Sequence, residues 1–405
     1  MKTSLITTLM ENHSPLLVFL TIGPVALFFL LSVFMWLRMR NSSTYWFISS
    51  IFSFFMFLGS YTILYTFYHV DTSQSQINNT PIYTITEQNS FLDKNTKQRE
   101  MDPSLQYLIP TGVIIKSINI QNENTVSLSG SIWQTYTQKD KDLAKEVVIL
   151  NARSSQITPT YQLKTENGIV YGFDFKVELI KQLDYTQFPL DKQKINVELA
   201  HSSLTKPVIL TPDFSSWKTD ENQQIGIDEN LNPTKLAIEK TYYSYTTKKS
   251  SANHGVKDYI FANNFPVLNF NINIKREVIN LLILVFLPVI TILVLSFAFL
   301  LMFRRLFSRP HSYLSINAAI LFALIVSHQR LRDLIPSNVP SYPEYAYFLS
   351  YIIILFNIML AVRYVKTLGS TETIKSMPKE TLFFRLMYWP FVFTNFLIIT
   401  VMFFT

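Results

Sequence analysis

Hydrophobic residues are concentrated in six blocks, and most polar residues lie in the long stretch between the second and third blocks. The blocks contain no Asp, Glu, Lys or Arg, and they cover residues 15–37, 45–68, 278–303, 313–329, 345–362 and 386–405. A membrane-spanning helix needs roughly 17 to 25 mostly apolar residues. The pattern therefore predicts six transmembrane helices, with the fourth and fifth blocks at the lower limit of length.

The first block is predicted to be a membrane helix rather than a cleaved signal peptide. A signal peptide combines a basic start, a short apolar stretch and a cleavage site of small residues. Here the apolar run is longer than that, and Arg38 and Arg40 follow it as a stop-transfer flank.

Lys and Arg residues in the short loops set the predicted orientation. They lie between blocks one and two, three and four, and five and six: Arg38, Arg40, Arg304, Arg305, Arg309, Arg363, Lys366, Lys375, Lys379 and Arg385. Such residues favour the cytoplasmic side. Residues 70–276 and both chain ends are then outside, which predicts a multi-pass protein of the cell (inner) membrane with a large periplasmic or extracellular domain.

The polar middle of the chain is predicted to be an all-β domain. Residues 71–103 are rich in Thr, Asn, Gln and Ser and are typical of a linker with one helical turn. Apolar and polar residues then alternate or form short β-branched runs, which predicts strands at 113–120, 125–133, 170–180, 194–199 and 267–274. Several short strands separated by turns indicate a sandwich or barrel.

Composition narrows the classes of function. The formal net charge is +7, and there is no basic patch in a nucleic-acid-binding context, so no nucleic-acid partner is expected. The chain has no cysteine, which suits a bacterial envelope protein built without disulfides. Neither metal-ligand His spacing nor a catalytic glycine-rich motif is present. We therefore expect neither an enzyme nor a bound cofactor.

Several motifs in this order resemble the pentameric ligand-gated ion channels, the Cys-loop receptor superfamily, and especially its bacterial members without cysteines. Residues 184–193, Asp-Tyr-Thr-Gln-Phe-Pro-Leu-Asp-Lys-Gln, are similar to the family's signature loop. Residues 227–231 resemble the loop before the family's ninth strand, and Arg276 and Pro288 resemble its last-strand basic residue and first-helix proline. Residues 314–342 resemble the pore-lining helix and its outer link.

The resemblance implies an immunoglobulin-like outer sandwich over 104–276 and a four-helix transmembrane channel domain over 277–405. It also implies a homopentamer that conducts inorganic ions and is surrounded by membrane lipid. Residues 1–70, with two additional membrane helices, depart from the family pattern. The fourth block also lacks the threonine-rich inner rings that are common in the family.

The fourth block differs from its neighbours because it carries many small and polar residues. At helical spacing one stripe is formed by Ser315, Ala319, Phe322, Val326 and Gln329. Such a stripe faces either another helix or a water-filled cavity. The resemblance favours pore lining, in which rings of Phe322 and Val326 form a hydrophobic constriction. Cation or anion selectivity is left open, because the basic inner loops and Asp333 point in opposite directions.

In the family, the signature loop, the first β-turn and the end of the last strand press on the outer ends of the membrane helices. The resemblance assigns this gating junction to Glu123, Pro189, Asp191, Arg276 and Pro336. Arg276 at the membrane boundary also needs an acidic partner, and either Asp191 or Glu123 can supply a charge-assisted hydrogen bond. The alternative is an interfacial arginine solvated by lipid headgroups.

The family binds agonists between subunits in a box of aromatic side chains. The resemblance assigns this role to Trp133, Tyr242, Tyr243, Tyr245, Tyr259 and Phe261. Aromatic faces attract ammonium groups, although aromatic residues on strands also serve as core or cross-strand pairs. The basic loop that contains Lys248, Lys249, His254 and Lys257 suits an anion or protons equally well. The agonist is therefore an unidentified small molecule or protons.

The predicted function is a subunit of a homopentameric ligand-gated ion channel whose pore helix lies around residues 312–333. The alternative is a non-conducting membrane receptor, sensor or scaffold whose two N-terminal helices bind a partner. Ion conduction by the reconstituted protein distinguishes the two hypotheses.

Overall fold

The computed structural model describes residues 15–37, 43–69, 81–99, 106–122, 124–217, 224–231, 236–253, 255–257, 259–262, 265–306, 310–335, 338–368 and 379–404. The chain divides into two compact units. The helical unit comprises Met1–Asp71, Tyr185–Leu190 and Val278–Thr405, and the β unit comprises Thr72–Asp184 and Asp191–Glu277.

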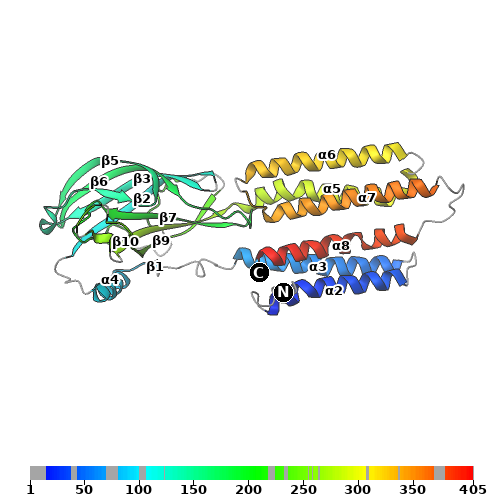
Figure 1. Cartoon of the computed structure of the whole chain (residues 1–405), viewed down its shortest axis with the longest axis horizontal. Coiled ribbons are helices and arrows are strands. Elements are labelled where there is room, and N and C mark those ends of the chain that lie inside the picture. Colours follow the sequence, from blue (N-terminus) through cyan, green and yellow to red (C-terminus); the bar gives the residue numbers. More distant parts are fainter. Residues whose placement is uncertain are drawn as a thin grey trace. The chain divides into compact units, whose positions relative to one another are not determined.

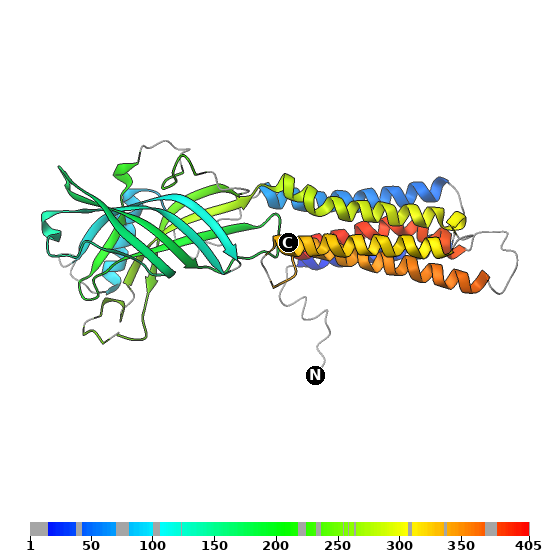
Figure 2. The ribbon, with the colours of Figure 1, turned by 90° about the horizontal axis from the view of Figure 1, so that it is seen from above.

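The helical unit contains long helices that run roughly parallel or antiparallel to one another (Figures 1 and 2). They are α2 (Pro15–Leu37), α3 (Ser43–His69), α5 (Val278–Leu306), α6 (Pro310–Leu334), α7 (Tyr342–Leu368) and α8 (Lys379–Phe404). Five of them, α3 and α5 to α8, are long and apolar enough to cross a membrane. The described side chains of α2 add a shorter apolar stretch, Gly23–Leu37. The chain is therefore a multi-pass membrane protein.

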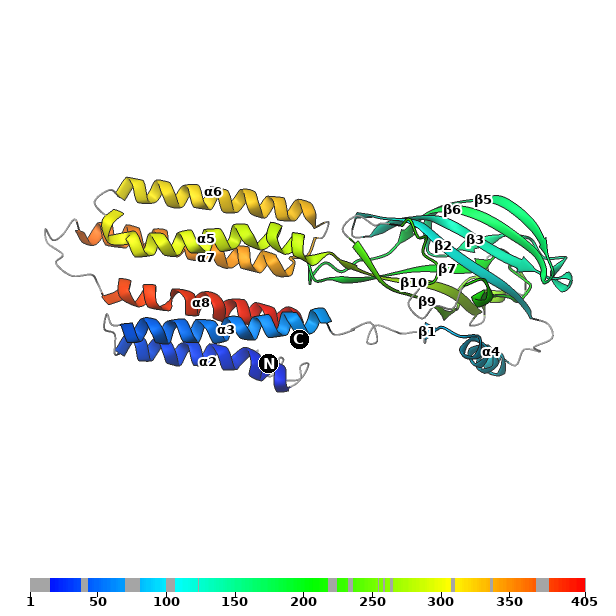
Figure 3. The same cartoon turned by 180° about the vertical axis from the view of Figure 1, so that it is seen from behind.

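The two N-terminal helices pack against α8. Met35 of α2 is fully buried against Leu386 and Met387, and Met56 of α3 lies in a cluster with Leu397. On another side of the bundle, α6 lies at the rim beside α5 and α7 (Figures 1 and 3). Within this unit, α6 is thus placed away from the layer that α2 and α3 form.

The β unit contains two five-stranded sheets that form a β-sandwich. One has the order β1 (Pro81–Ile82), β9 (Leu236–Lys248), β10 (Phe265–Arg276), β7 (Lys192–His201), β4 (Val147–Ile149). The other has the order β5 (Ala152–Thr165), β6 (Gly168–Ile180), β3 (Thr125–Tyr136), β2 (Tyr107–Asn122), β8 (Val208–Pro212). Neighbouring strands are antiparallel, except that β2 and β8 are parallel.

The alternation of buried and partly exposed side chains along the strands explains how the two sheets pack together. Side chains of β3 and β7 are alternately buried and partly exposed over most of their length. The inward residues Leu128, Ile195 and Phe270 are almost completely buried, and each such side chain contributes about 1.5–3 kcal/mol by leaving water. Across the core, the Tyr245 hydroxyl donates a hydrogen bond to the Leu210 carbonyl at 2.9 Å.

The five predicted strands are confirmed, since they lie within β2, β3, β6, β7 and β10. The strands β4, β5, β8 and β9 were not predicted. Most side chains of β5 are exposed, so this edge strand has no buried face to produce a period-two pattern.

The prediction of one helical turn at 71–103 was wrong. This stretch contains β1 and a 15-residue helix, α4 (Ile85–Arg99). The helix begins with a capping box: Glu87 Oε2 accepts the backbone N–H groups of Tyr83 (2.7 Å) and Thr84 (3.2 Å), and the Thr84 hydroxyl accepts the Glu87 N–H. The Thr84-x-x-Glu87 spacing was the sequence signal for this helix. Phe91 of α4 stacks on Tyr245 with ring centroids 4.7 Å apart, which docks the helix on β9.

Candidate functional site

The predicted stripe lies on the exposed face of α6, where Ala319, Phe322 and Val326 border grooves against α5. The buried face of α6 is formed by Tyr313, Asn317, Ile320, Leu324 and Leu331. Residues on an α-helix are about 100° apart, so the stripe Ser315, Ala319, Phe322, Val326 and Gln329 falls roughly opposite this face. All five stripe residues are exposed, with Phe322 at 68% and Val326 at 47%.

The exposed stripe combines small, polar and apolar side chains rather than apolar chains alone. Exposing polar groups to lipid is costly, so this face favours contact with other protein or with water. On the buried face, the Asn317 amide donates a hydrogen bond to the Tyr313 carbonyl at 2.9 Å. The stripe is therefore the part of α6 that is available to another copy of the chain or to a water-filled conduit.

The C-terminal part of α6 is tied to the first turn of α7 by a buried carboxylate. Glu344 is fully buried, and its Oε1 accepts hydrogen bonds from the Ser341 N–H and hydroxyl, both at 3.0 Å. Its Oε2 lies 2.6 Å from Arg332 Nη2 and 3.6 Å from His328 Nε2. A buried charge needs such a partner, so the ion pair fixes α6 against α7. This pair was not predicted from the sequence.

The signature-like loop, residues 185–190, belongs to the helical unit. The Thr186 carbonyl accepts the backbone N–H of Tyr342 at 2.7 Å, at the first residue of α7. The Gln187 amide donates to the Phe403 carbonyl of α8 at 2.8 Å. Leu190 packs in a cluster with Val278, Tyr342 and Phe404. The loop is thus docked on the ends of α5, α7 and α8 that lie together.

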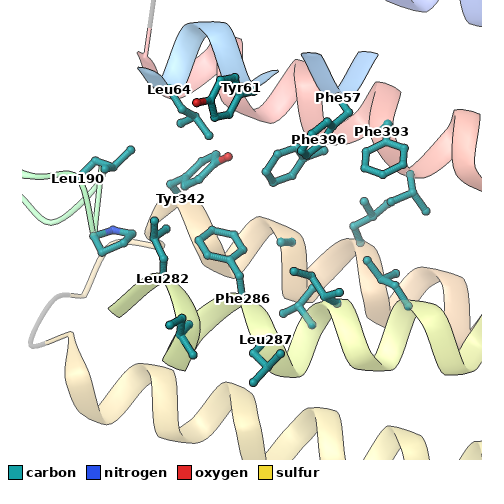
Figure 4. A pocket seen from close by; sticks show the side chains of 18 of the residues that line it. Phe57, Tyr61, Leu64, Leu190, Leu282, Phe286, Leu287, Tyr342, Phe393 and Phe396 are labelled. Atoms are coloured by element: carbon teal, nitrogen blue, oxygen red, sulfur yellow. The ribbon is translucent and has the colours of Figure 1, made fainter. Parts of the chain in front are cut away.

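Beside this loop is an apolar cavity of about 590 Å³ between α3, α5, α7 and α8 (Figure 4). Pro189 and Leu190 line it together with Phe286, Tyr342 and Phe396. Its walls are almost wholly apolar, so it suits an apolar molecule. Sequence reasoning assigned Pro189 to a gating junction, and the structure places it at the edge of this cavity.

The β unit contains the ion pair that was predicted for Arg276. The Arg276 Nε donates to both carboxylate oxygens of Asp191, at 2.8 and 3.1 Å, and Asp191 is 2% exposed. The Gln193 amide also donates to Asp191 Oδ2 at 2.8 Å, and Gln193 Oε1 accepts the Asp184 N–H at 3.2 Å. The proposed partners are therefore Arg276 and Asp191, while Glu123 and Pro336 lie outside the described residues.

This ion pair lies where the chain passes between the two units. Leu190 is the last loop residue in the helical unit, and Asp191 begins the return to the β unit. Arg276 is next to Glu277, after which the chain enters α5 at Val278. The Asp191–Arg276 pair therefore links two places, far apart in the sequence, where the chain passes from one unit to the other.

The Trp133 side chain is hydrogen-bonded to a carboxylate, and its ring lies in space that a glycine leaves open. Its indole Nε1 donates to Asp213 Oδ2 at 2.9 Å, and its ring lies 5.6 Å from that of Trp217. A Cβ atom on Gly112 would lie 2.0 Å from the Trp133 ring, so only glycine allows this close approach. Burial raises the pKa of the Asp213 carboxyl, but hydrogen bonds from Ser216, Ser215 and Trp133 outweigh it and leave the pKa below its usual value.

The tyrosines of β9 are engaged within their own chain. Tyr243 and Tyr245 are buried, and Tyr243 packs against Phe270 with ring centroids 5.2 Å apart. Tyr242 is also buried, and the ammonium of Lys194 lies 5.5 Å from the centre of its ring. These contacts give the three tyrosines a packing role, and their role in ligand binding stays a prediction.

The remaining aromatic candidates lie after β9. Tyr259 and Phe261 are neighbours, with ring centroids 5.6 Å apart, and Phe261 also packs on Phe265. Both residues lie in the connection between β9 and β10, two strands of the sheet that carries the three tyrosines, whereas Trp133 is on β3 of the other sheet. Their role in a ligand site between two copies of the chain stays a prediction.

In the part of the chain that the structure describes, no group of three or more His, Cys, Asp or Glu side chains is placed to hold a metal ion. No model of a known protein family matches the chain, and no curated protein matches it. Function is therefore inferred from the geometry of α6, the docked loop and the Asp191–Arg276 pair.

Proposed function

We propose that the chain is a subunit of a homopentameric ligand-gated ion channel of the kind that its sequence resembles, with α6 as the pore-lining helix. The observation that carries this proposal is the exposed face of α6. Ser315, Ala319, Phe322, Val326 and Gln329 form a mixed stripe on a helix at the rim of the bundle. Five copies that surround a common axis with this stripe bury it around water instead of exposing it to lipid.

The physical basis of the gate is dewetting. Rings of Phe322 and Val326 produce a narrow apolar girdle, from which water and hydrated ions are excluded until the helices move apart. Ser315 and Gln329 place polar groups on either side of this girdle. Opening then requires a small displacement of α6 rather than a rearrangement of the whole bundle.

Two contacts support a coupling route from the β unit to α6. The loop 185–190 is bonded to the start of α7, and the first turn of α7 holds α6 through Glu344 and Arg332. The Asp191–Arg276 pair keeps the two chain crossings together. Agonist binding in the β unit, at an interface between copies, would move these crossings and thereby the loop.

The proposed topology has six membrane spans, with the β unit and both chain ends on the periplasmic or extracellular side of the inner membrane. The β unit would then be an immunoglobulin-like sandwich, as in the family that the sequence resembles. The basic loops after α2, α5 and α7 support this orientation. The α2 and α3 helices would form a lipid-facing layer on α8.

Electrical recording from the purified protein in planar bilayers tests the proposal. A small-molecule screen is run together with a pH series, and Phe322→Ala is compared with the matched control Phe54→Ala, which removes a phenyl ring that is 60% exposed on α3. We expect leak or altered gating from Phe322→Ala and wild-type currents from Phe54→Ala. Equal behaviour of the two variants would contradict the assignment of the stripe.

The absence of cysteine permits a second test. Ser315→Cys and Val326→Cys introduce the only thiols, and a water-soluble thiol reagent should block current through either variant. Leu324→Cys, on the buried face of α6, is the control and should be unaffected. A protein that passes no ions under any stimulus would favour the non-conducting receptor or scaffold.

A further inference from the structure

A second cavity, of about 450 Å³, lies within the helical unit between α2, α5, α7 and α8. Its walls include Phe28 and Ser32 of α2, Leu300 of α5, Phe356 and Asn357 of α7, and Phe384 of α8. The aromatic walls pack on one another, since the rings of Phe356 and Phe384 are 4.8 Å apart. Helix α2 therefore completes a cavity that the last four helices would leave open on that side.

The cavity contains an amide donor without a partner. Asn357 is 1% exposed, and its Nδ2 has no hydrogen-bond partner among the residues that the structure describes. Other polar groups in the walls are satisfied: the Ser32 hydroxyl donates to the Phe29 carbonyl at 2.7 Å, and the Tyr388 hydroxyl donates to the Leu293 carbonyl at 2.8 Å. Because buried donors in folded proteins are nearly always paired, Asn357 indicates a ligand that supplies a hydrogen-bond acceptor.

A cationic group is bonded to the backbone of one wall residue of this cavity. Arg385 Nε donates to the carbonyl of Leu300, a wall residue, at 3.0 Å, and its Nη2 donates to the Leu301 carbonyl at 2.9 Å. Arg385 follows Phe384, and Asn357 follows Phe356, so the packed Phe356–Phe384 pair places the two polar residues at a similar level of the bundle. Arg385 lies near the start of the membrane span of α8, Thr381–Phe404, where a phosphate group of a lipid is within reach.

We propose that this cavity binds one diacyl phospholipid from the membrane. An acyl chain would occupy the space between the phenylalanines, the ester carbonyl would accept the Asn357 amide, and the phosphate would meet Arg385. Carbonyl and phosphate oxygens are the acceptors that the two donors require, and hydrocarbon suits the aromatic walls. The lipid would then join α2 to α5, α7 and α8, whether or not the protein conducts ions.

Binding of matched ester and ether phospholipids to the purified full chain tests the Asn357 contact. The two lipids have the same chains and headgroup, but the ether lipid lacks the ester carbonyl, and native mass spectrometry counts the lipid retained. We expect the wild-type protein to prefer the ester lipid by about five-fold or more, as for one buried hydrogen bond. Asn357→Leu should abolish this preference, and the control Asn317→Leu on α6 should retain it.

The phosphate contact is tested with diacylglycerol, which keeps the esters and lacks the phosphate. The wild-type protein should retain the phospholipid in preference, and Arg385→Gln should lose that preference while still favouring ester over ether. Equal binding of the ester and ether lipids by the wild-type protein would overturn the proposal without any variant. Retention of the ester preference in Asn357→Leu would overturn the assignment of the amide donor.

Discussion

The buried ion pair between Arg332 and Glu344 predicts an asymmetric response to neutralising its two members. Glu344 is completely buried, whereas the Arg332 side chain is 38% exposed. Arg332→Gln therefore leaves a carboxylate inside the bundle without its cation. Removing one partner of a buried pair costs about 3–5 kcal/mol.

The converse change, Glu344→Gln, should cost less. The glutamine can still accept the capping hydrogen bonds from Ser341, and the partly exposed guanidinium of Arg332 regains water. We expect a loss of about 1–2 kcal/mol, close to that of one unsatisfied group next to an exposed charge. The double variant should be more stable than Arg332→Gln alone, because its glutamines carry no uncompensated charge.

Thermal unfolding of the purified protein measures these differences. At about 2–4 °C per kcal/mol, Arg332→Gln should lower the midpoint by roughly 6–20 °C and Glu344→Gln by roughly 2–8 °C. Asp333→Asn, which changes an exposed charge on the same turn, is the control and should shift it little. Equal losses for the two single variants, or strictly additive losses in the double variant, would refute the coupling.

The remaining predictions concern the β unit. Asp191→Asn should lower the unfolding free energy of this unit by about 2–4 kcal/mol, because the guanidinium at the end of β10 loses a buried partner. Glu239→Gln is the control: its lysine contacts are 3.7 and 3.8 Å long, so its loss should cost less than about 1 kcal/mol. Similar losses for the two variants in chemical denaturation would contradict this ranking. Burial lowers the pKa of His201, so the unfolded chain takes up its proton first, at about pH 6.5. Stability should therefore fall as the pH drops below that value, and His201→Gln should flatten this part of the pH profile; an unchanged profile would exclude His201 as its source. Gly112→Ala should displace the ring of Trp133 and shift its fluorescence at a cost of about 1–3 kcal/mol, and an unchanged emission spectrum would contradict the close approach.

The sequence was most informative where structure depends on local periodicity. The uncharged blocks at 15–37 and 278–303 correspond to α2 and to most of α5, because the length of an apolar run limits a helix in a membrane without reference to its neighbours. Alternation predicted β3 and β7 for a similar reason, since a half-buried strand records its two faces in the sequence. The exposed edge strand β5 has no buried face of this kind and was not predicted.

The candidate site was predicted in part. The stripe on α6 follows from helical spacing alone, but periodicity cannot say which face of a helix its neighbours cover. The structure settled that point by burying Tyr313, Asn317 and Leu324. The Asp191–Arg276 pair was anticipated because a charge at a membrane boundary needs a partner, although Glu123 was an equally acceptable choice from the sequence.

By itself, the sequence predicted the six long helices and five of the strands, since those depend on residues a few positions apart. Only the tertiary structure decided that residues 185–190 belong with the helices, that Glu344 holds Arg332, and that Asn357 lines a cavity completed by α2. These features join residues from distant parts of the chain. Their energies arise from burial and close contact, which periodic patterns do not encode.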